Sequence, residues 1–207
     1  MDTIQAIQKR RAVNYFDNSF KMTDKEITEL LEIASLAPSS YNIQPWEVIV
    51  VRSEERKKVL KECSFNQPKI QDASAVLIFI GNTDAQEENL DAVARDLVDK
   101  GYADLEAAEA VKNLAANFYG TPDSERRRLF ASKNIGLIAM SFMITAEAKG
   151  YSTHPMDGFE EDKIKAAFGI KAGKTIPLIV AVGKLDSTKP QLPKKMRFSP
   201  GRFAKFE

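Results

Sequence analysis

A short loop between two prolines, Pro38 and Pro45, is filled with hydroxyl and amide side chains. These side chains are Ser39, Ser40, Tyr41, Asn42 and Gln44. The prolines restrict the backbone, and a loop that only connects two elements rarely needs so many donors and acceptors. The segment Ala37–Trp46 is therefore a candidate binding segment.

An adjacent pair of arginines, Arg10 and Arg11, follows a short predicted helix. A guanidinium group matches a phosphate in a bidentate way, which favours a phosphate-binding role. Basic residues at the end of a helix also complement the helix dipole, which needs no ligand. The pair alone leaves both interpretations open.

Few side chains of this sequence can act as nucleophiles, bases or metal ligands. His154 and Cys63 are the only histidine and the only cysteine, so they cannot build a Cys/His zinc site. Cys63 lies late in an amphipathic helix and is interpreted as a small core residue. The Gly-x-Gly-x-x-Gly, Gly-x-x-x-x-Gly-Lys-Ser/Thr and Gly-x-Ser-x-Gly motifs are absent. An enzyme with this inventory needs a cofactor.

Helices and strands are interleaved along the chain, and these elements must position the groups above. Thr23 and Glu26 form a capping-box pair that begins a helix, and Pro38 ends it. The continuous apolar run Ala75–Ile80 is typical of a central strand that is buried on both faces. The other expected helices are 2–9, 53–62, 84–100, 104–119, a long one from an N-cap at 121–122 to about 149, and 161–168; the other strands are 46–51, 151–154 and 177–182. This pattern predicts one α+β domain over residues 1–207, with a central sheet sandwiched between helices.

Composition and charge narrow the functional classes. The chain has 207 residues, of which 43% are hydrophobic and 29% are charged, and its net charge is +1. This balance is typical of a globular protein and gives no general attraction to nucleic acid or to an anionic membrane. Since no apolar run is long enough to span a bilayer and the N-terminal residues lack a signal-peptide pattern, we expect a cytoplasmic protein. Because the chain has one cysteine and one histidine, we also expect no metal.

Charge is nevertheless unevenly distributed. Residues 84–109 contain nine acidic and two basic side chains, which we interpret as a solvated helical face. Residues 184–207 contain seven basic and two acidic side chains in an extended, proline-interrupted tail. Three consecutive arginines at 126–128 are interpreted as another solvated helix face. The stretch Ile135–Ile144 is apolar nearly all round, which predicts burial by its own domain and by a partner subunit.

Taken together, these segments resemble the nitroreductase family of FMN enzymes. The Arg10-Arg11 pair resembles the family's N-terminal arginine motif, and the proline-bounded loop resembles its Pro-Ser-Ser-x-Asn-x-Gln-Pro-Trp pattern. Asn66-Gln67-Pro68-Lys69 resembles the Asn-x-x-Lys segment, and residues 154–159 resemble the Pro-x-x-Gly-Phe turn. Lys194–Arg197 resembles the basic C-terminal element. The motifs occur in the family's order and spacing over the whole chain, which implies a central antiparallel or mixed sheet and an intertwined homodimer.

The resemblance implies a role for each matching residue. The FMN phosphate would be held by Arg10, Arg11 and one of Lys195 or Arg197. The flavin of the partner subunit would be approached by Pro38, Ser39, Ser40 and Asn42. The pyrimidine edge of the ring would contact Asn66 and Lys69, and its reactive edge would face Pro155, Met156, Asp157 and Gly158. Ala12 and Asn14 lie in the phosphate-binding segment but depart from the family's serine and basic residue, which leaves the detail of phosphate binding and redox tuning open.

The resemblance also implies an activity. Residues 84–131 would form a helical insertion that roofs the active site, where Phe118 and Tyr119 are candidates for stacking on a planar substrate. NAD(P)H would deliver hydride to FMN, and a nitroaromatic or a quinone would then be reduced, with no catalytic side chain. Enone reduction, dehalogenation and a flavin-binding redox sensor are alternatives, and nucleic-acid binding by the basic tail ranks below them. The sequence does not distinguish NADH from NADPH.

Overall fold

Four antiparallel strands form one sheet in the computed structural model, which describes residues 1–207. The strands are β1 (Trp46–Val51), β2 (Ala75–Gly81), β3 (Ser152–Met156) and β4 (Thr175–Gly183). Their order across the sheet is β1-β2-β4-β3, so that β1 and β3 are the two edge strands. The predicted α+β class and the central sheet are confirmed, and the sheet is wholly antiparallel.

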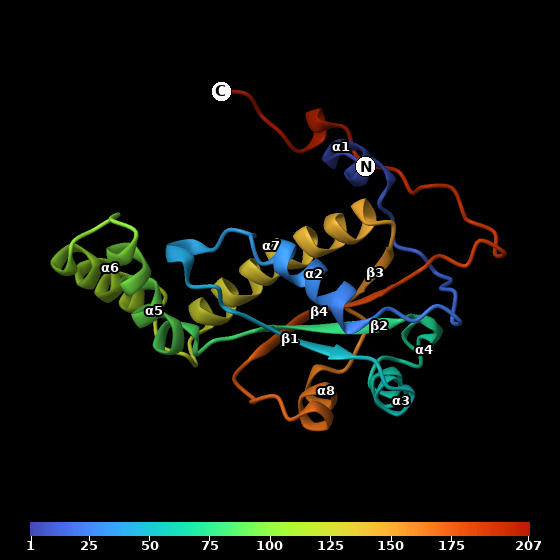
Figure 1. The fold of residues 1–207 in the computed structure, drawn as a ribbon, viewed down its shortest axis with the longest axis horizontal. Helices are drawn as coiled ribbons and strands as arrows, with labels where there is room; N and C mark the ends of the chain where they lie inside the picture. The colour runs from blue at the N-terminus through green and yellow to red at the C-terminus, as the bar shows by residue number, and fades with distance from the viewer.

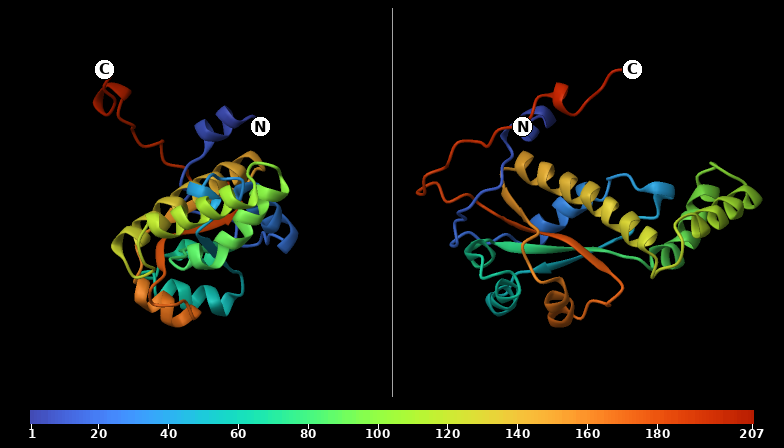
Figure 2. Two further views of the ribbon diagram at one scale, coloured as in Figure 1. Left: turned by 90° about the vertical axis from the view of Figure 1, so that its left-hand side faces the viewer. Right: turned by 180° about the vertical axis from the view of Figure 1, so that it is seen from behind.

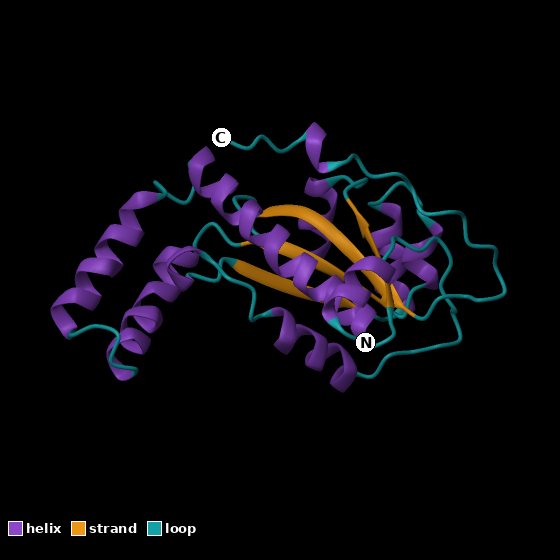
Figure 3. Cartoon of the chain, turned by 90° about the horizontal axis from the view of Figure 1, so that it is seen from above, coloured by secondary structure: helices purple, strands orange, loops and turns teal.

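Helices cover both faces of this sheet (Figures 1 and 2). They are α1 (Thr3–Lys9), α2 (Asp24–Ala34), α3 (Glu54–Glu62), α4 (Pro68–Asp72), α5 (Ala85–Asp99), α6 (Leu105–Phe118), α7 (Glu125–Ala148) and α8 (Glu161–Phe168), with 3-10 turns η1 (Ser40–Asn42) and η2 (Pro200–Arg202). Buried residues of α2 and α7 form the core on one face, and those of α3, α4 and α8 form the core on the other. The antiparallel pair α5–α6 extends beyond the sheet (Figure 3).

Strand β2 is buried along its whole length, as its apolar run predicts. Successive side chains of a strand point to opposite faces. Val76, Ile78 and Ile80 accordingly pack in the α3–α8 core. Leu77 and Phe79 pack in the α2–α7 core. One strand therefore holds both halves of the hydrophobic core together.

Helix α7 is the central helix of the fold. Its 24 residues would be long and apolar enough to cross a membrane, but 56% of its most apolar window is buried inside the protein. It packs on the sheet, where the Phe142 ring lies 5.9 Å from the Phe79 ring. It begins at Glu125, because the Ser124 side chain accepts a hydrogen bond from the Arg127 backbone. The predicted start at 121–122 is wrong, since these residues form a turn before the helix.

Arg127 also contradicts the solvated face predicted for residues 126–128. Its side chain is only 1% exposed. The guanidinium donates to Glu87 at 2.8 and 3.2 Å, to the Thr83 carbonyl at 2.8 Å and to the Gly120 carbonyl. Arg127 therefore joins the start of α7, the start of α5 and the turn after α6. Arg126 and Arg128 are exposed, as predicted.

The capping box of α2 forms as predicted and also ties α2 to the segment before β3. The Glu26 carboxylate accepts hydrogen bonds from the Thr23 backbone at 2.7 Å and from the Tyr151 hydroxyl at 2.6 Å. These bonds, that of Tyr151 first, lower the pKa of Glu26 from 4.5 to about 2. The folded state therefore favours the ionised form of this side chain.

This shift predicts an acid-dependent loss of stability. The contribution of Glu26 should be present above pH 4.5 and should disappear as the pH falls towards 2, because protonation then favours the unfolded chain. The free energy of unfolding, measured in urea from pH 5 to 2, should fall less steeply in Glu26→Gln than in the wild type. Glu32→Gln, an exposed site on the same helix, is the control. Equal slopes for Glu26→Gln and the wild type would contradict the assignment.

Candidate functional site

Edge strand β3 holds the N-terminal segment that carries the arginine pair. Ala12 forms a β-bridge with Thr153. The Val13 backbone N–H donates to the Thr153 carbonyl at 3.2 Å, and the His154 Nδ1 lies 2.6 Å from the Val13 carbonyl oxygen. The first segment of the predicted site is thus fixed along the outer edge of the sheet.

His154 serves this contact as a neutral side chain. Its burial and the nearby charge of Lys69 lower its pKa, and the hydrogen bond to Val13 only partly opposes this shift. The neutral ring donates its Nδ1 proton to the Val13 carbonyl. The prediction that His154 is a structural residue agrees with this geometry.

A second segment, Phe65–Lys69, docks against the turn after β3. The Gln67 side chain donates to the Gly158 carbonyl at 2.8 Å, and Lys69 donates to the Gln67 side chain at 3.3 Å. Phe65 and Asn66 have left-handed φ values of 51° and 56°, an uncommon conformation for residues other than glycine. The backbone therefore bends sharply at Asn66, and the side chain of this residue is exposed. Lys69 lies in α4, a helix that the sequence did not predict. Burial lowers the pKa of Lys69.

Gln67 is the residue of this site that sequence reasoning missed. It lies between Asn66 and Lys69 in the recognised segment, but no role was assigned to it. Its bond to Gly158 fixes the distance between two loops that are about 90 residues apart in the chain. Its place inside the motif was the signal that could have identified it.

The third predicted segment, Pro155–Gly158, belongs partly to β3 itself. The strand begins at Ser152 and extends to Met156, whereas the sequence predicted a strand over 151–154. Pro155 lacks a backbone donor, and it is tolerated because β3 is an edge strand. Met156 is buried in the core, and Asp157 is exposed. The backbone of this turn therefore faces the Phe65–Lys69 loop at the sheet edge.

The arginine pair meets the start of the C-terminal tail. Arg11 donates to the Leu192 carbonyl, and Lys194 donates to the Gln8 carbonyl. The Nε atom of Arg11 is buried without a partner. Arg10 is half-buried, and none of the hydrogen bonds or ion pairs of the protein uses its side chain. The Arg10 guanidinium is therefore free to bind an anion.

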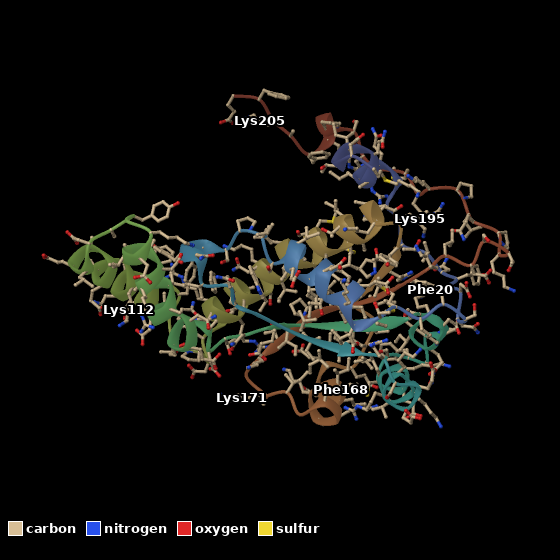
Figure 4. The ribbon with its side chains drawn as sticks, in the orientation of Figure 1. Phe20, Lys112, Phe168, Lys171, Lys195 and Lys205 are labelled. Atoms are coloured by element: carbon tan, nitrogen blue, oxygen red, sulfur yellow. The ribbon has the colours of Figure 1, made fainter.

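The two basic residues predicted from the tail, Lys195 and Arg197, are exposed. Arg197 donates only to carbonyls of its own tail, those of Lys195 and Met196. Lys195 and Lys112, which lies on the α5–α6 pair, mark opposite ends of the molecule (Figure 4). The tail thus meets the segment of the arginine pair through Leu192 and Lys194.

The proline-bounded loop lies at the other edge of the sheet. It forms η1 and leads into β1, whose Trp46 pairs with Gly81 at the end of β2. Helix α4 precedes Ala75, at the opposite end of β2, so about 20 Å of strand separates the two. Ser39, Ser40 and Asn42 therefore do not join the β3 segments within one chain.

Backbone conformation and packing shape this loop. Tyr41, Asn42 and Gln44 have φ values of 54°, 53° and 52°, which cost free energy unless neighbours hold them. Ser39 Oγ accepts from the Gln44 backbone at 2.9 Å, and Asn89 of α5 donates to the Ile43 carbonyl at 2.9 Å. The α5–α6 pair thus braces the loop.

The predicted substrate residues, Phe118 and Tyr119, lie beside this loop. The Phe118 ring is 6.5 Å from the Tyr41 ring and 4.9 Å from the Tyr119 ring. Tyr119 stacks on Phe130 at 4.0 Å. Phe118 remains 45% exposed. The aromatic cluster thus presents a partly exposed ring next to η1.

A hollow of about 530 Å³ lies elsewhere, between α7, α8 and β4. Its lining residues are Asp123, Glu125, Arg128, Leu129, Ser132, Glu161, Thr175, Ile176 and Pro177. None of these residues is among the predicted cofactor-binding or substrate-binding residues. The two groups of predicted residues lie on open surfaces of one chain.

Comparisons with known proteins identify the family of this chain. The model of the nitroreductase family matches residues 7–184. YdgI of Bacillus subtilis, whose name assigns it to the NAD(P)H nitroreductases, is 32% identical over 186 residues and covers 88% of each chain.

Two solved structures share the fold. The structure of ydfN, named as a nitroreductase of Bacillus subtilis, superposes with a TM-score of 0.92 at 25% identity and covers 99% of this chain and 98% of its own. A nitroreductase of Exiguobacterium sibiricum, solved in complex with FMN, superposes with a TM-score of 0.88 at 28% identity and covers 100% and 98%. The family expected from the sequence motifs is confirmed: this chain belongs to the nitroreductase family of oxidoreductases.

Proposed function

We propose that this chain binds FMN between two copies of itself and transfers hydride from NAD(P)H to nitroaromatic or quinone acceptors. The observation that supports this most is the meeting of three segments at β3, where Gln67 bonds to Gly158 and His154 bonds to Val13. Arg10, whose guanidinium is free, lies two residues before the Ala12–Thr153 bridge, and Lys69 is close enough to His154 for its charge to lower the pKa of that residue. A phosphorylated, electron-accepting ring system suits two such cations.

The residues at the junction fit FMN. Arg10 has no protein partner and the buried Nε of Arg11 lacks one, so both have donors left for a phosphate. Lys69 and Asn66 place a cation and an amide where the pyrimidine edge of the ring would lie. When bound, FMN supplies the two-electron chemistry, and Lys69 stabilises negative charge on the reduced ring.

The remaining residues of the junction would line the space that the flavin occupies. Pro155, Met156, Asp157 and Gly158 present backbone towards the reactive edge of the ring. Ala12 and Asn14 are exposed beside the arginine pair. Because they supply no hydroxyl and no further cation, the phosphate depends on Arg10, Arg11 and the tail residue Lys195 or Arg197.

A two-fold dimer would bring the second group of residues to the flavin. The polar loop Pro38–Asn42 lies at the sheet edge opposite β3, so only a second copy can place it against the same ring. Helix α7 exposes Leu129, Leu137 and Met140 at 63%, 42% and 37%, which offers an apolar face to that copy. A two-fold contact would then form two equivalent sites.

The reaction has two halves in this proposal. With FMN bound, NAD(P)H would bind over the ring, give up a hydride and leave as NAD(P)⁺. The acceptor would then occupy the same place, stack on Phe118 and Tyr119 of the roof formed by residues 84–131, and take up the hydride together with a proton from water. The chain orients both molecules and contributes no acid or base side chain. We place the protein in the cytoplasm, which supplies NAD(P)H and suits its single free cysteine.

The test is an absorbance spectrum of the purified protein. It should be yellow or become so with added FMN, and NADH or NADPH should bleach it without oxygen. Addition of a nitroaromatic or a quinone should restore the oxidised spectrum. A colourless protein that FMN cannot reconstitute would contradict the proposal, and a bound flavin that NAD(P)H never bleaches would favour a redox sensor.

A further inference from the structure

Arg126 carries an unpaired charge over an aromatic surface. Its guanidinium carbon lies 4.7 Å from the centre of the Phe118 ring and 5.9 Å from that of Tyr119. The side chain is exposed and makes no hydrogen bond and no ion pair, although residues 84–109 of the neighbouring helices are strongly acidic. Its cation is therefore held in place by stacking rather than by a carboxylate.

The stability of α7 does not explain why residue 126 is an arginine. Arg126 lies in the first turn of α7, where the helix dipole disfavours a positive charge. Its neighbour Arg127 is buried and joins three segments, and Arg128 points to the hollow beside α8. Among the three arginines, Arg126 alone is available at the aromatic cluster.

The cluster lies at the edge of the site proposed for the flavin. Phe118 contacts Tyr41 of η1, and η1 contains the polar groups proposed to reach the ring. Arg127 donates to the Gly120 carbonyl, which fixes the turn that follows Phe118 and Tyr119. Phe118 therefore has Arg126 over its ring and Tyr41 of η1 as a neighbour, and it remains 45% exposed.

We propose that Arg126 selects planar acceptors whose ring carries an anionic group, such as a carboxylate. This inference rests on the proposed function, since it names the class of acceptor for the same site. Stacking occupies the face of a guanidinium and leaves its N–H groups free at the edge, where they match a carboxylate in a bidentate way. The anionic group of the acceptor bonds to the edge of Arg126, while the acceptor ring lies against the part of Phe118 that Arg126 leaves exposed.

Binding to the FMN-loaded protein tests this without turnover. Benzoate and benzyl alcohol are planar probes that differ in charge, and flavin absorbance reports their binding. In Arg126→Gln the Kd of benzoate should rise about fivefold, as expected for an exposed ion pair, while that of benzyl alcohol should not change. Arg126→Lys should retain part of the preference, and Arg128→Gln should behave as the wild type.

Turnover supplies the second readout. With 4-nitrobenzoate, Arg126→Gln should raise KM about fivefold and leave kcat unchanged, with no effect on 4-nitrobenzyl alcohol. Equal effects on both acceptors, or unchanged binding of benzoate, would overturn the inference. A rise in the KM of NAD(P)H of the same size would also overturn it, by assigning Arg126 to the dinucleotide phosphates. Failure of the wild type to reduce either acceptor would contradict the proposed function, whereas the benzoate titration would still test Arg126.

Discussion

Replacing Arg127 with methionine should lower the free energy of unfolding by about 3 kcal/mol or more. The guanidinium is almost wholly buried and donates to the carbonyls of Thr83 and Gly120. Methionine fills part of the space but leaves both carbonyls without a donor, and each such loss costs about 1–3 kcal/mol. Urea denaturation monitored by circular dichroism measures the change.

Two further variants separate the causes of this loss. Arg128→Met changes an exposed arginine in the same turn and should stay within about 0.5 kcal/mol of the wild type. Glu87→Gln removes the charge of a partner that is 51% exposed, so it should cost less than about 1 kcal/mol. Similar losses for Arg127→Met and Arg128→Met would show that the buried network contributes little.

Replacing Arg10 with alanine should raise the Kd of FMN by about 10- to 100-fold. Each charge-assisted hydrogen bond to a phosphate contributes about 1.5–3 kcal/mol, and the side chain of Arg10 has no protein partner to lose. The loss should therefore appear in cofactor affinity and not in the stability of the protein without FMN. Quenching of flavin fluorescence on binding measures this Kd.

Riboflavin, which lacks the phosphate, is the discriminating ligand. Its Kd should be the same in the wild type and in Arg10→Ala. Lys9→Ala is the control variant, because it removes an adjacent cation that is paired with Glu147. Equal weakening of FMN and riboflavin would assign Arg10 to the shape of the site and not to the phosphate.

The elements that the sequence predicted well are those with local causes. The start of α2 follows from Thr23 and Glu26, which lie within one turn and satisfy each other's backbone. The burial of β2 follows from a continuous apolar run bounded by polar residues and Gly81, which is typical of a central strand. In both cases residues close together in the chain determine the element, so the prediction did not depend on contacts between distant residues.

The features that the sequence missed depend on distant partners. The sequence predicted a solvated Arg127, because its contacts with Thr83 and Glu87 are distant in the chain and leave no local sequence signal. The long helix begins at Glu125 and not at 121–122, because the Ser124 side chain caps the Arg127 backbone while the Thr121 side chain bonds to Asp123 in its own turn. The competing caps have similar local chemistry, and only the folded turn decides between them.

The candidate site shows the same division. The motifs located the segments of Arg10, Asn66 and Gly158, and the resemblance assigned them to one cofactor. The sequence could not predict that these segments lie together at β3. Their arrangement depends on the hydrogen bond of Gln67 to Gly158 and on an edge strand that tolerates Pro155. The roles of the individual residues remain predictions that the variants above can test.

The α5–α6 pair has a consequence for how proteins of this kind diversify. Its two helices pack chiefly on each other, and a small cluster around Ile43 and Phe130 joins them to the rest. Substitutions or length changes in the outer turns of the pair leave the sheet core and the β3 junction untouched. Inherited variation can therefore accumulate there without loss of the fold. If residues 84–131 form the proposed roof of the active site, a mutagenesis library confined to 91–114 would change the acceptors and leave the cofactor-binding segments unchanged.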